Sequence, residues 1–175
     1  MERWQYNVEL PARKNEKKEF PSGEKGAIFC PVCRSVYYKK SWHHALKQSL
    51  ARGKSSLKAK TYKLKTILCP ACQMIKDKEF EGQLAIGGFP ANFKSDLVQL
   101  IKNFCQRAFE RDPMDRLIDI KTDKSGLVVT VTENQLAVKL AKKIKEAFNK
   151  YKIRMKISYS PEPSDTAYIK LNFSE

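Results

Sequence analysis

The chain has 175 residues, of which 42% are hydrophobic, so it can form one domain or two small ones around a modest core. Its longest apolar run, Ala27 to Cys30, is far shorter than the roughly 20 residues that span a bilayer, and the first residues lead into no apolar segment typical of a secretion signal, so we expect a soluble, cytoplasmic protein. The 34 Lys and Arg residues outnumber the 19 Asp and Glu residues, and the net charge of +15 indicates a polyanionic partner.

Positive charge is concentrated in the first half of the chain. From Lys25 to Lys76 the sequence holds 12 Lys or Arg residues and no Asp or Glu. A surface that serves only solubility mixes both signs, because like charges repel one another. This stretch therefore predicts binding to nucleic acid in preference to an anionic membrane surface.

The first expected elements surround the first of two matched cysteine motifs. Residues 1–24 show no periodicity and predict a flexible arm. The motif Cys30-Pro-Val-Cys33 is followed by a short strand over residues 36–38. Ser41 is placed to cap a helix over residues 42–51, which a glycine closes.

A basic loop over residues 54–60 leads to the second cysteine motif. Alternation over residues 62–67 predicts a strand that runs into Cys69-Pro-Ala-Cys72. Each Cys-x-x-Cys pair can form a tight knuckle that directs two thiolates to one point, and two facing knuckles complete a tetrahedral site for Zn²⁺. The pattern predicts a zinc ribbon with a basic helical insertion, and its metal ligands are Cys30, Cys33, Cys69 and Cys72.

The cysteine pattern leaves other interpretations open. Disulfides suit an oxidising compartment, for which the sequence gives no signal, and a redox pair needs one Cys-x-x-Cys rather than two matched copies. An iron–sulfur cluster uses the same four ligands. Four sulfurs leave no open position for a substrate, so the metal is expected to stabilise the fold.

The fifth cysteine, Cys105, lies in an apolar helical stripe and is expected to be a core residue.

Glycines and Pro90 mark a boundary, so the zinc ribbon is expected to span residues 25–90 and a second domain residues 91–175. Leu84 and Ile86 predict a last strand before this boundary. The second domain is expected to be α+β, with one face of its sheet covered by helix and the other free. Its expected order is α-β-β-α-β-β. The first helix carries an apolar stripe from Leu97 to Ala108, and the second, over residues 133–150, begins at a capping box of Thr132 and Gln135. The expected strands span residues 117–121, 127–131, 153–159 and 167–173.

The basic insertion is the expected binding surface. Its ammonium groups can neutralise phosphates and its aromatic rings can stack on unpaired bases, a mixture that favours RNA. Strand alternation turns one of two adjacent tyrosines inward, and Trp42 suits the core equally well. We expect phosphate or base contacts from His43 and His44, with a structural role as the alternative. The candidate nucleic-acid-binding residues are Tyr37, Tyr38, Lys39, Lys40, Trp42, His43, His44, Lys47, Arg52, Lys54, Lys58, Lys60, Lys63 and Lys65.

The sequence contains no constellation typical of catalysis. Asp77, Glu79 and Glu81 lie in a lysine-rich context that does not suit a nuclease, and the glycine spacing matches neither a Walker loop nor a dinucleotide-binding motif. We therefore expect a binding protein rather than an enzyme.

The combination of motifs resembles a known family. The chain is similar to bacterial and archaeal zinc-ribbon proteins in two segments, Cys-Pro-Val-Cys with Val-Tyr-Tyr-Lys-Lys-Ser-Trp-His and Cys-Pro-Ala-Cys with Phe-Glu-Gly-Gln-Leu. Those proteins in turn resemble the N-terminal region of the nonsense-mediated-decay-three family, the export adaptor of the large ribosomal subunit. The resemblance covers roughly residues 28–173 and implies zinc at the four cysteines and binding to ribosomal or other RNA. The family commonly has glycine after the first knuckle, where Arg34 stands here, and the insertion of this chain is richer in lysine.

Three functions are compatible with these features. The first is a zinc-stabilised RNA-binding protein on or near the large ribosomal subunit. The second is a DNA-binding or transcription-linked zinc ribbon, and the third is an adaptor that docks a protein on the free sheet face. Only Arg34 and Arg52 accompany the ten lysines of the basic stretch. Because Lys acts as a point charge whereas Arg reads guanine edges, contact with the nucleic-acid backbone is favoured over sequence-specific readout of DNA.

Overall fold

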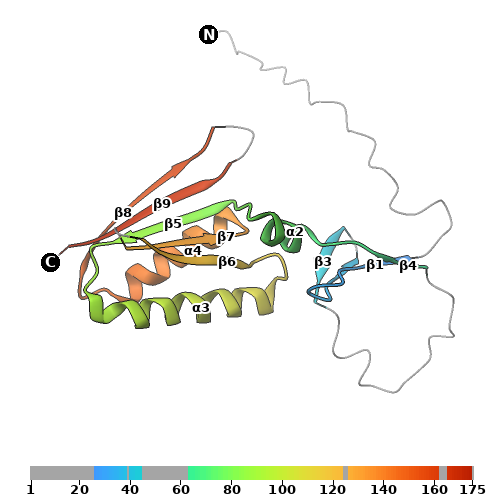
Figure 1. Cartoon of the computed structure of the whole chain (residues 1–175), viewed down its shortest axis with the longest axis horizontal. Coiled ribbons are helices and arrows are strands. Elements are labelled where there is room, and N and C mark those ends of the chain that lie inside the picture. Colours follow the sequence, from blue (N-terminus) through green and yellow to red (C-terminus); the bar gives the residue numbers. More distant parts are fainter. Residues whose placement is uncertain (1–25, 39, 45–62, 124–125, 162–164, 175) are drawn as a thin grey trace, which may run out of the picture.

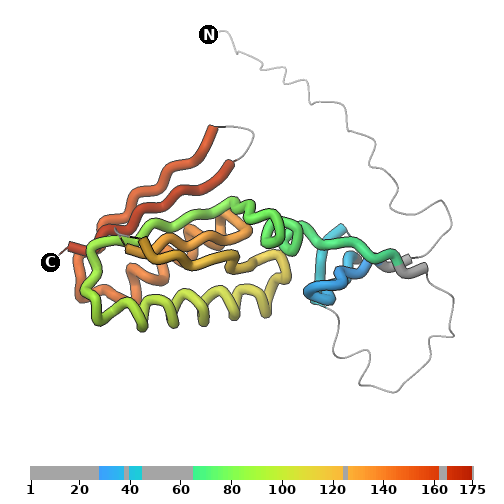
Figure 2. Tube along the Cα trace, in the orientation of Figure 1, coloured from blue at the N-terminus to red at the C-terminus, as the bar shows by residue number. Residues whose placement is uncertain are grey.

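The chain folds into two sheets and three α-helices within the residues that the structure describes (Figure 1). The computed structural model describes residues 26–38, 40–44, 63–123, 126–161 and 165–174. The expected arm and the expected loop at 54–60 lie outside these ranges. The trace in Figure 2 places the smaller sheet at one end of the long axis and the larger sheet at the other, with α2 between them. The predicted mixed α+β class is confirmed.

The smaller sheet has the strand order β3-β2-β1-β4. Strand β1 pairs antiparallel with β2 and parallel with β4, so β4 is an edge strand. The strands expected over residues 36–38 and 62–67 are both present. The four strands are β1 (Gly26–Phe29), β2 (Val36–Tyr38), β3 (Ser41–His43) and β4 (Lys63–Thr66).

The helix expected to begin at Trp42 is wrong where the structure describes it. Ser41 does not cap a helix, because residues 41–43 form β3, which pairs with β2. Trp42 lies opposite Tyr37, and their rings meet edge to face with 5.4 Å between centroids. This cross-strand aromatic pair favours the extended backbone over a helix. Residues 45–51 of the expected helix lie outside the described part of the chain.

The larger sheet has the order β6-β7-β5-β9-β8. The expected α-β-β-α-β-β elements are present, and the strand at Leu84 and Ile86 is the central strand of this sheet rather than the last strand of the N-terminal unit. Helix α2 was not predicted. The elements are α2 (Pro70–Asp77), β5 (Gly82–Gly87), a 3₁₀ turn (Ala91–Phe93), α3 (Lys94–Arg111), β6 (Leu117–Asp123), β7 (Gly126–Val131), α4 (Asn134–Ala147), β8 (Lys152–Tyr159) and β9 (Ala167–Ser174).

Helices α3 and α4 cover one face of the larger sheet and share one core with it. The predicted stripe of α3 is buried at Leu97, Ile101, Cys105 and Ala108 and half-buried at Leu100 and Phe104. Helix α4 buries Leu140 and Ile144 completely. Cys105 is buried as expected, and burial, with a smaller effect from Asp115, raises the pKa of its thiol to about 12. This thiol is therefore an unreactive core group.

The capping box expected at the start of α4 is wrong. The N-cap of this helix is Glu133, and its side chain makes no capping hydrogen bond. The Thr132 hydroxyl donates instead to the Met114 carbonyl oxygen at 2.6 Å and accepts from the Arg116 N–H at 2.8 Å. Thr132 therefore fixes the segment between α3 and β6, because its long-range partners replace the local cap.

Gly82 allows β5 to pack closely against α4. A Cβ atom at this position would lie 2.5 Å from the Ala137 Cβ atom and 2.8 Å from a Val131 methyl group. We expect Gly82→Val to lower the free energy of unfolding by about 3 kcal/mol, because overpacking forces the helix away from the strand. Urea unfolding measures this change. The control Ala85→Val adds methyl groups to the opposite face of the same strand, and an equal loss in both variants would contradict the close approach.

Candidate metal centre

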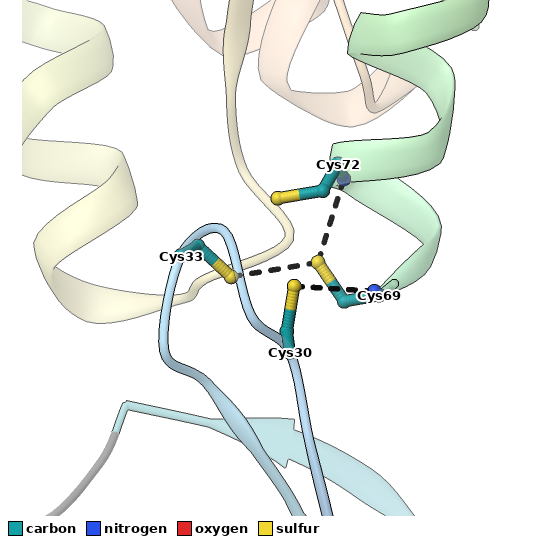
Figure 3. Close-up of side chains that lie close together, drawn as sticks. All are labelled: Cys30, Cys33, Cys69 and Cys72. Carbon is teal, nitrogen blue, oxygen red and sulfur yellow. Dashed lines mark hydrogen bonds between the residues drawn. The ribbon is translucent and has the colours of Figure 1, made fainter. Parts of the chain in front are cut away.

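Four cysteine side chains converge where the turn after β1 meets the first turn of α2 (Figure 3). Their sulfur atoms all lie within 4.8 Å of one another, and the Sγ atoms of Cys33 and Cys69 are 3.5 Å apart. Four sulfurs bound about 2.3 Å from a central metal lie about 3.8 Å apart, so a small closure of the cluster satisfies tetrahedral coordination. Within the described ranges, this is the one group of His, Cys, Asp and Glu side chains close enough to share an ion. The predicted ligand set can hold a metal.

The first cysteine pair lies in a tight turn between β1 and β2. The Cys30 N–H donates to the Ser35 carbonyl oxygen at 2.9 Å, and the Arg34 N–H donates to the Cys30 carbonyl oxygen at 3.0 Å. Arg34 closes the turn with φ of 62°, the left-handed region that glycine adopts most easily. This geometry explains why glycine suits the position after the knuckle, and Arg34 retains the turn.

The second cysteine pair lies in the first turn of α2. Cys69 is the N-cap, and its sulfur accepts from the Cys72 N–H at 3.4 Å. Pro70 follows at the first helical position, where its missing N–H costs nothing. Both thiolates therefore lie at the positive end of a helix, which favours negative charge. The sequence analysis expected a second knuckle here, and the N-cap cysteine followed by proline was the available signal for a helix.

Backbone N–H groups stabilise the sulfurs. The Cys69 N–H donates to the Cys30 sulfur at 3.4 Å. Burial alone would raise the pKa of Cys30, but N–H groups of Cys33, Cys69 and Val32 lower it to about 6. Burial raises the pKa of Cys69, and burial together with Cys33 raises that of Cys72 to about 11. A cation at the centre of the cluster would favour the thiolate form of the cysteines, and its binding would displace the thiol protons.

Side chains from both parts of the chain enclose the cysteines. Trp42 from β3, Leu68 and Met114 pack against the cluster. Met114 belongs to the segment between α3 and β6, so the C-terminal unit supplies one wall of the centre. Sequence reasoning missed this residue, because no pattern in the second domain pointed toward the cysteines. Trp42 is half-buried on the cluster, which gives it a structural contact.

A second contact joins the two parts of the chain. The His44 ring meets the Phe109 ring of α3 edge to face at 4.7 Å, and His44 Nε2 forms a hydrogen bond with the Phe109 carbonyl oxygen. The Arg116 guanidinium lies 4.3 Å from the centroid of the same Phe109 ring. His44 is therefore held against α3, and Phe109 and Arg116 are contact residues that the sequence analysis did not single out.

The candidate nucleic-acid residues are only partly described. Lys40 lies in the turn between β2 and β3 with φ of 64° and is exposed, as is His43 on β3. Lys65 is exposed on β4, and Tyr38 and Lys63 lie in β2 and β4. The residues outside the described ranges are Lys39, Lys47, Arg52, Lys54, Lys58 and Lys60.

Several carboxylates gather beside the start of α4. Burial raises the pKa of Glu133, and the negative charges of Glu81, Asp115 and Asp112 raise it further. The folded state thus binds this proton more tightly than the unfolded state, and stability falls as pH rises from the unfolded pKa through the folded one. We expect Glu133→Gln to raise the free energy of unfolding at pH 7 and to change nothing at a pH below the unfolded pKa. Urea titrations at both pH values test this, with exposed Glu110→Gln as control, and a pH-independent gain would contradict it.

Neither a protein-family model nor a curated protein sequence matches this chain. The described helices include none that is long and apolar enough to cross a membrane.

Proposed function

We propose that the chain is a zinc-stabilised RNA-binding protein that acts on or near the large ribosomal subunit. The observation that carries the proposal is the stretch from Lys25 to Lys76, which holds 12 cations and no carboxylate and contains all four clustered cysteines. The cations of such a segment repel one another, and a polyanion that binds them relieves this repulsion. The resemblance to zinc-ribbon proteins related to a ribosomal export adaptor supports the choice of partner.

Zinc is the proposed metal because four thiolates in tetrahedral geometry suit it and leave no site for chemistry. Iron uses the same donors, so metal analysis of the purified protein distinguishes the two. One zinc per chain is the expected content, and iron in its place would overturn this assignment.

RNA is preferred to DNA because lysines dominate the basic stretch. Ten of its 12 cations are Lys, and Lys contacts phosphates as a point charge without the bidentate fork that reads guanine. Such a segment recognises the phosphate backbone and the shape of a nucleic acid, which is how proteins bind folded RNA. A DNA-binding zinc ribbon remains the alternative with the same electrostatics.

Sedimentation of a cell lysate through sucrose gradients tests the ribosomal partner. At low salt the protein is expected to cofractionate with the large subunit, and rising salt is expected to release it, because phosphate contacts weaken as counterions compete. Residence at the top of the gradient even at low salt would contradict the ribosomal assignment. If the protein in those top fractions is bound to material that ribonuclease removes, the partner would then be another RNA.

A further inference from the structure

The larger sheet has one face that α3 and α4 leave uncovered. Along β9, Tyr168 and Lys170 are exposed, whereas Ile169 and Leu171 between and beyond them are buried under the helices. Strand β8 alternates in the same way through Arg154 and its neighbours. The sheet therefore has an apolar face under the helices and a polar face, the open face, on its other side.

Cations cluster on the open face at its β8–β9 edge. Lys170 lies directly opposite Lys156, which places their Cβ atoms about 5 Å apart. Arg154 lies two residues before Lys156 and so projects from the same face about 7 Å away. Strands β5, β8 and β9 contain no Asp or Glu. None of these three cations, called here the cationic patch, forms an ion pair with a described residue.

An exposed aromatic ring lies beside the cationic patch. Tyr168 is 39% exposed and lies two residues from Lys170 on the same face. The Phe80 ring meets it edge to face with 6.3 Å between centroids and an angle of 86°. A ring held in this way loses little freedom when a base stacks on it, which favours binding.

The open face adjoins the segment that leaves the metal centre. Helix α2 begins at the second cysteine pair, and the chain after it crosses onto the open face at Phe80. Ile75, Lys78 and Phe80 line a hollow of about 180 Å³ together with residues of β6 and β7. The open face is therefore continuous with the segment that follows α2, whose first turn holds the second cysteine pair.

We propose that the open face is a second contact surface for single-stranded RNA, on which Tyr168 stacks on an unpaired base and the cationic patch contacts phosphates. The proposal rests on the RNA-binding function proposed above and adds the location of a further site. A protein partner fits less well, because the cores of protein interfaces are depleted in Lys. A duplex fits less well, because paired bases offer no free face to the tyrosine.

Binding of a fluorescent single-stranded oligouridylate to the full-length, metal-loaded protein tests the charge contribution. The double variant Lys156→Glu/Lys170→Glu is expected to bind about tenfold more weakly, and its slope of log K against log salt is expected to fall by about 1.4, since each phosphate contact on a single strand contributes about 0.7. Lys142→Glu/Lys145→Glu makes the same charge change on the exposed side of α4 and is the matched control. If both double variants weaken oligouridylate binding equally, the cationic patch is not a contact site for phosphates.

Tyr168→Ala tests the stacking contribution. It is expected to weaken binding about tenfold, whereas Tyr168→Phe keeps the aromatic ring and is expected to bind as the unchanged protein does. If the protein binds duplex RNA as tightly as single-stranded RNA, and the same substitutions weaken both, Tyr168 does not act by stacking on an unpaired base. If only substitutions in the basic stretch weaken binding, the open face is not a contact surface and the proposed function stands. If the unchanged protein fails to bind the oligouridylate, the RNA-binding function itself falls.

Discussion

Cys69→Ser is expected to abolish metal binding and unfold the smaller sheet while the larger sheet stays folded. Serine is also a good N-cap, so the variant keeps the cap of α2 and removes only the thiolate. Loss of an outer-shell partner costs about 10–100-fold in metal affinity, and loss of a direct ligand is expected to cost more than about 100-fold. Elemental analysis of the purified variant is expected to find almost no metal.

The local nature of this unfolding follows from the two separate cores. The cysteines and the few side chains around them form one cluster, and the helices α3 and α4 with the larger sheet form another. The small cluster contains too little apolar surface to be stable without a metal. Hydrogen exchange is expected to show rapid exchange in β1, β2 and α2 and retained protection in β5 and β9.

Cys105→Ala is the control, because Cys105 is a buried cysteine outside the metal cluster. Its metal content is expected to match that of the unchanged protein. A Cys69→Ser protein that retains one metal per chain, or that keeps protection in β1 and β2, would contradict a structural metal at this centre.

The cluster of four cysteines was predictable because spacing alone identifies it. Two Cys-Pro-x-Cys motifs need no knowledge of the fold to predict one four-sulfur cluster. The helices α3 and α4 and the last two strands were equally predictable, because each element buries one face and its apolar residues repeat with the period of that face.

The missed features depend on contacts between separate elements, which the pattern of one element does not reveal. Trp42 forms a strand because it pairs with Tyr37 and packs on the cysteines, and a capping residue before it could not reveal either partner. Strand β5 is central to the larger sheet through pairing with β7 and β9, which glycines at its ends concealed. The juxtaposition of Lys156 and Lys170 likewise depends on register, which the alternation of each strand leaves undetermined.

Replacement of four lysines of the basic stretch with glutamate is expected to abolish RNA binding under physiological salt. The four are Lys58, Lys60, Lys63 and Lys65. Two of them lie in β4, the edge strand of the smaller sheet, and Lys65 is exposed there. Loss of four phosphate contacts is expected to reduce the salt slope by about 2.8 for a single strand and affinity by more than about 100-fold. Fluorescence anisotropy with an oligouridylate over a salt series measures both quantities.

The same change of charge elsewhere distinguishes a local contact from the effect of net charge. Glutamates in place of four exposed cations of the helical side, Lys102, Lys142, Lys145 and Lys150, lower the net charge equally. Because screening limits exposed charges to about 10 Å at 0.1 M salt, charges on the far side of α3 and α4 contribute little to a strand held at β4. The control is therefore expected to keep most of its affinity and its salt slope. Retained binding in the β4 variant, or equal loss in both, would place the RNA contact outside the basic stretch, because affinity would then follow total charge or a different surface.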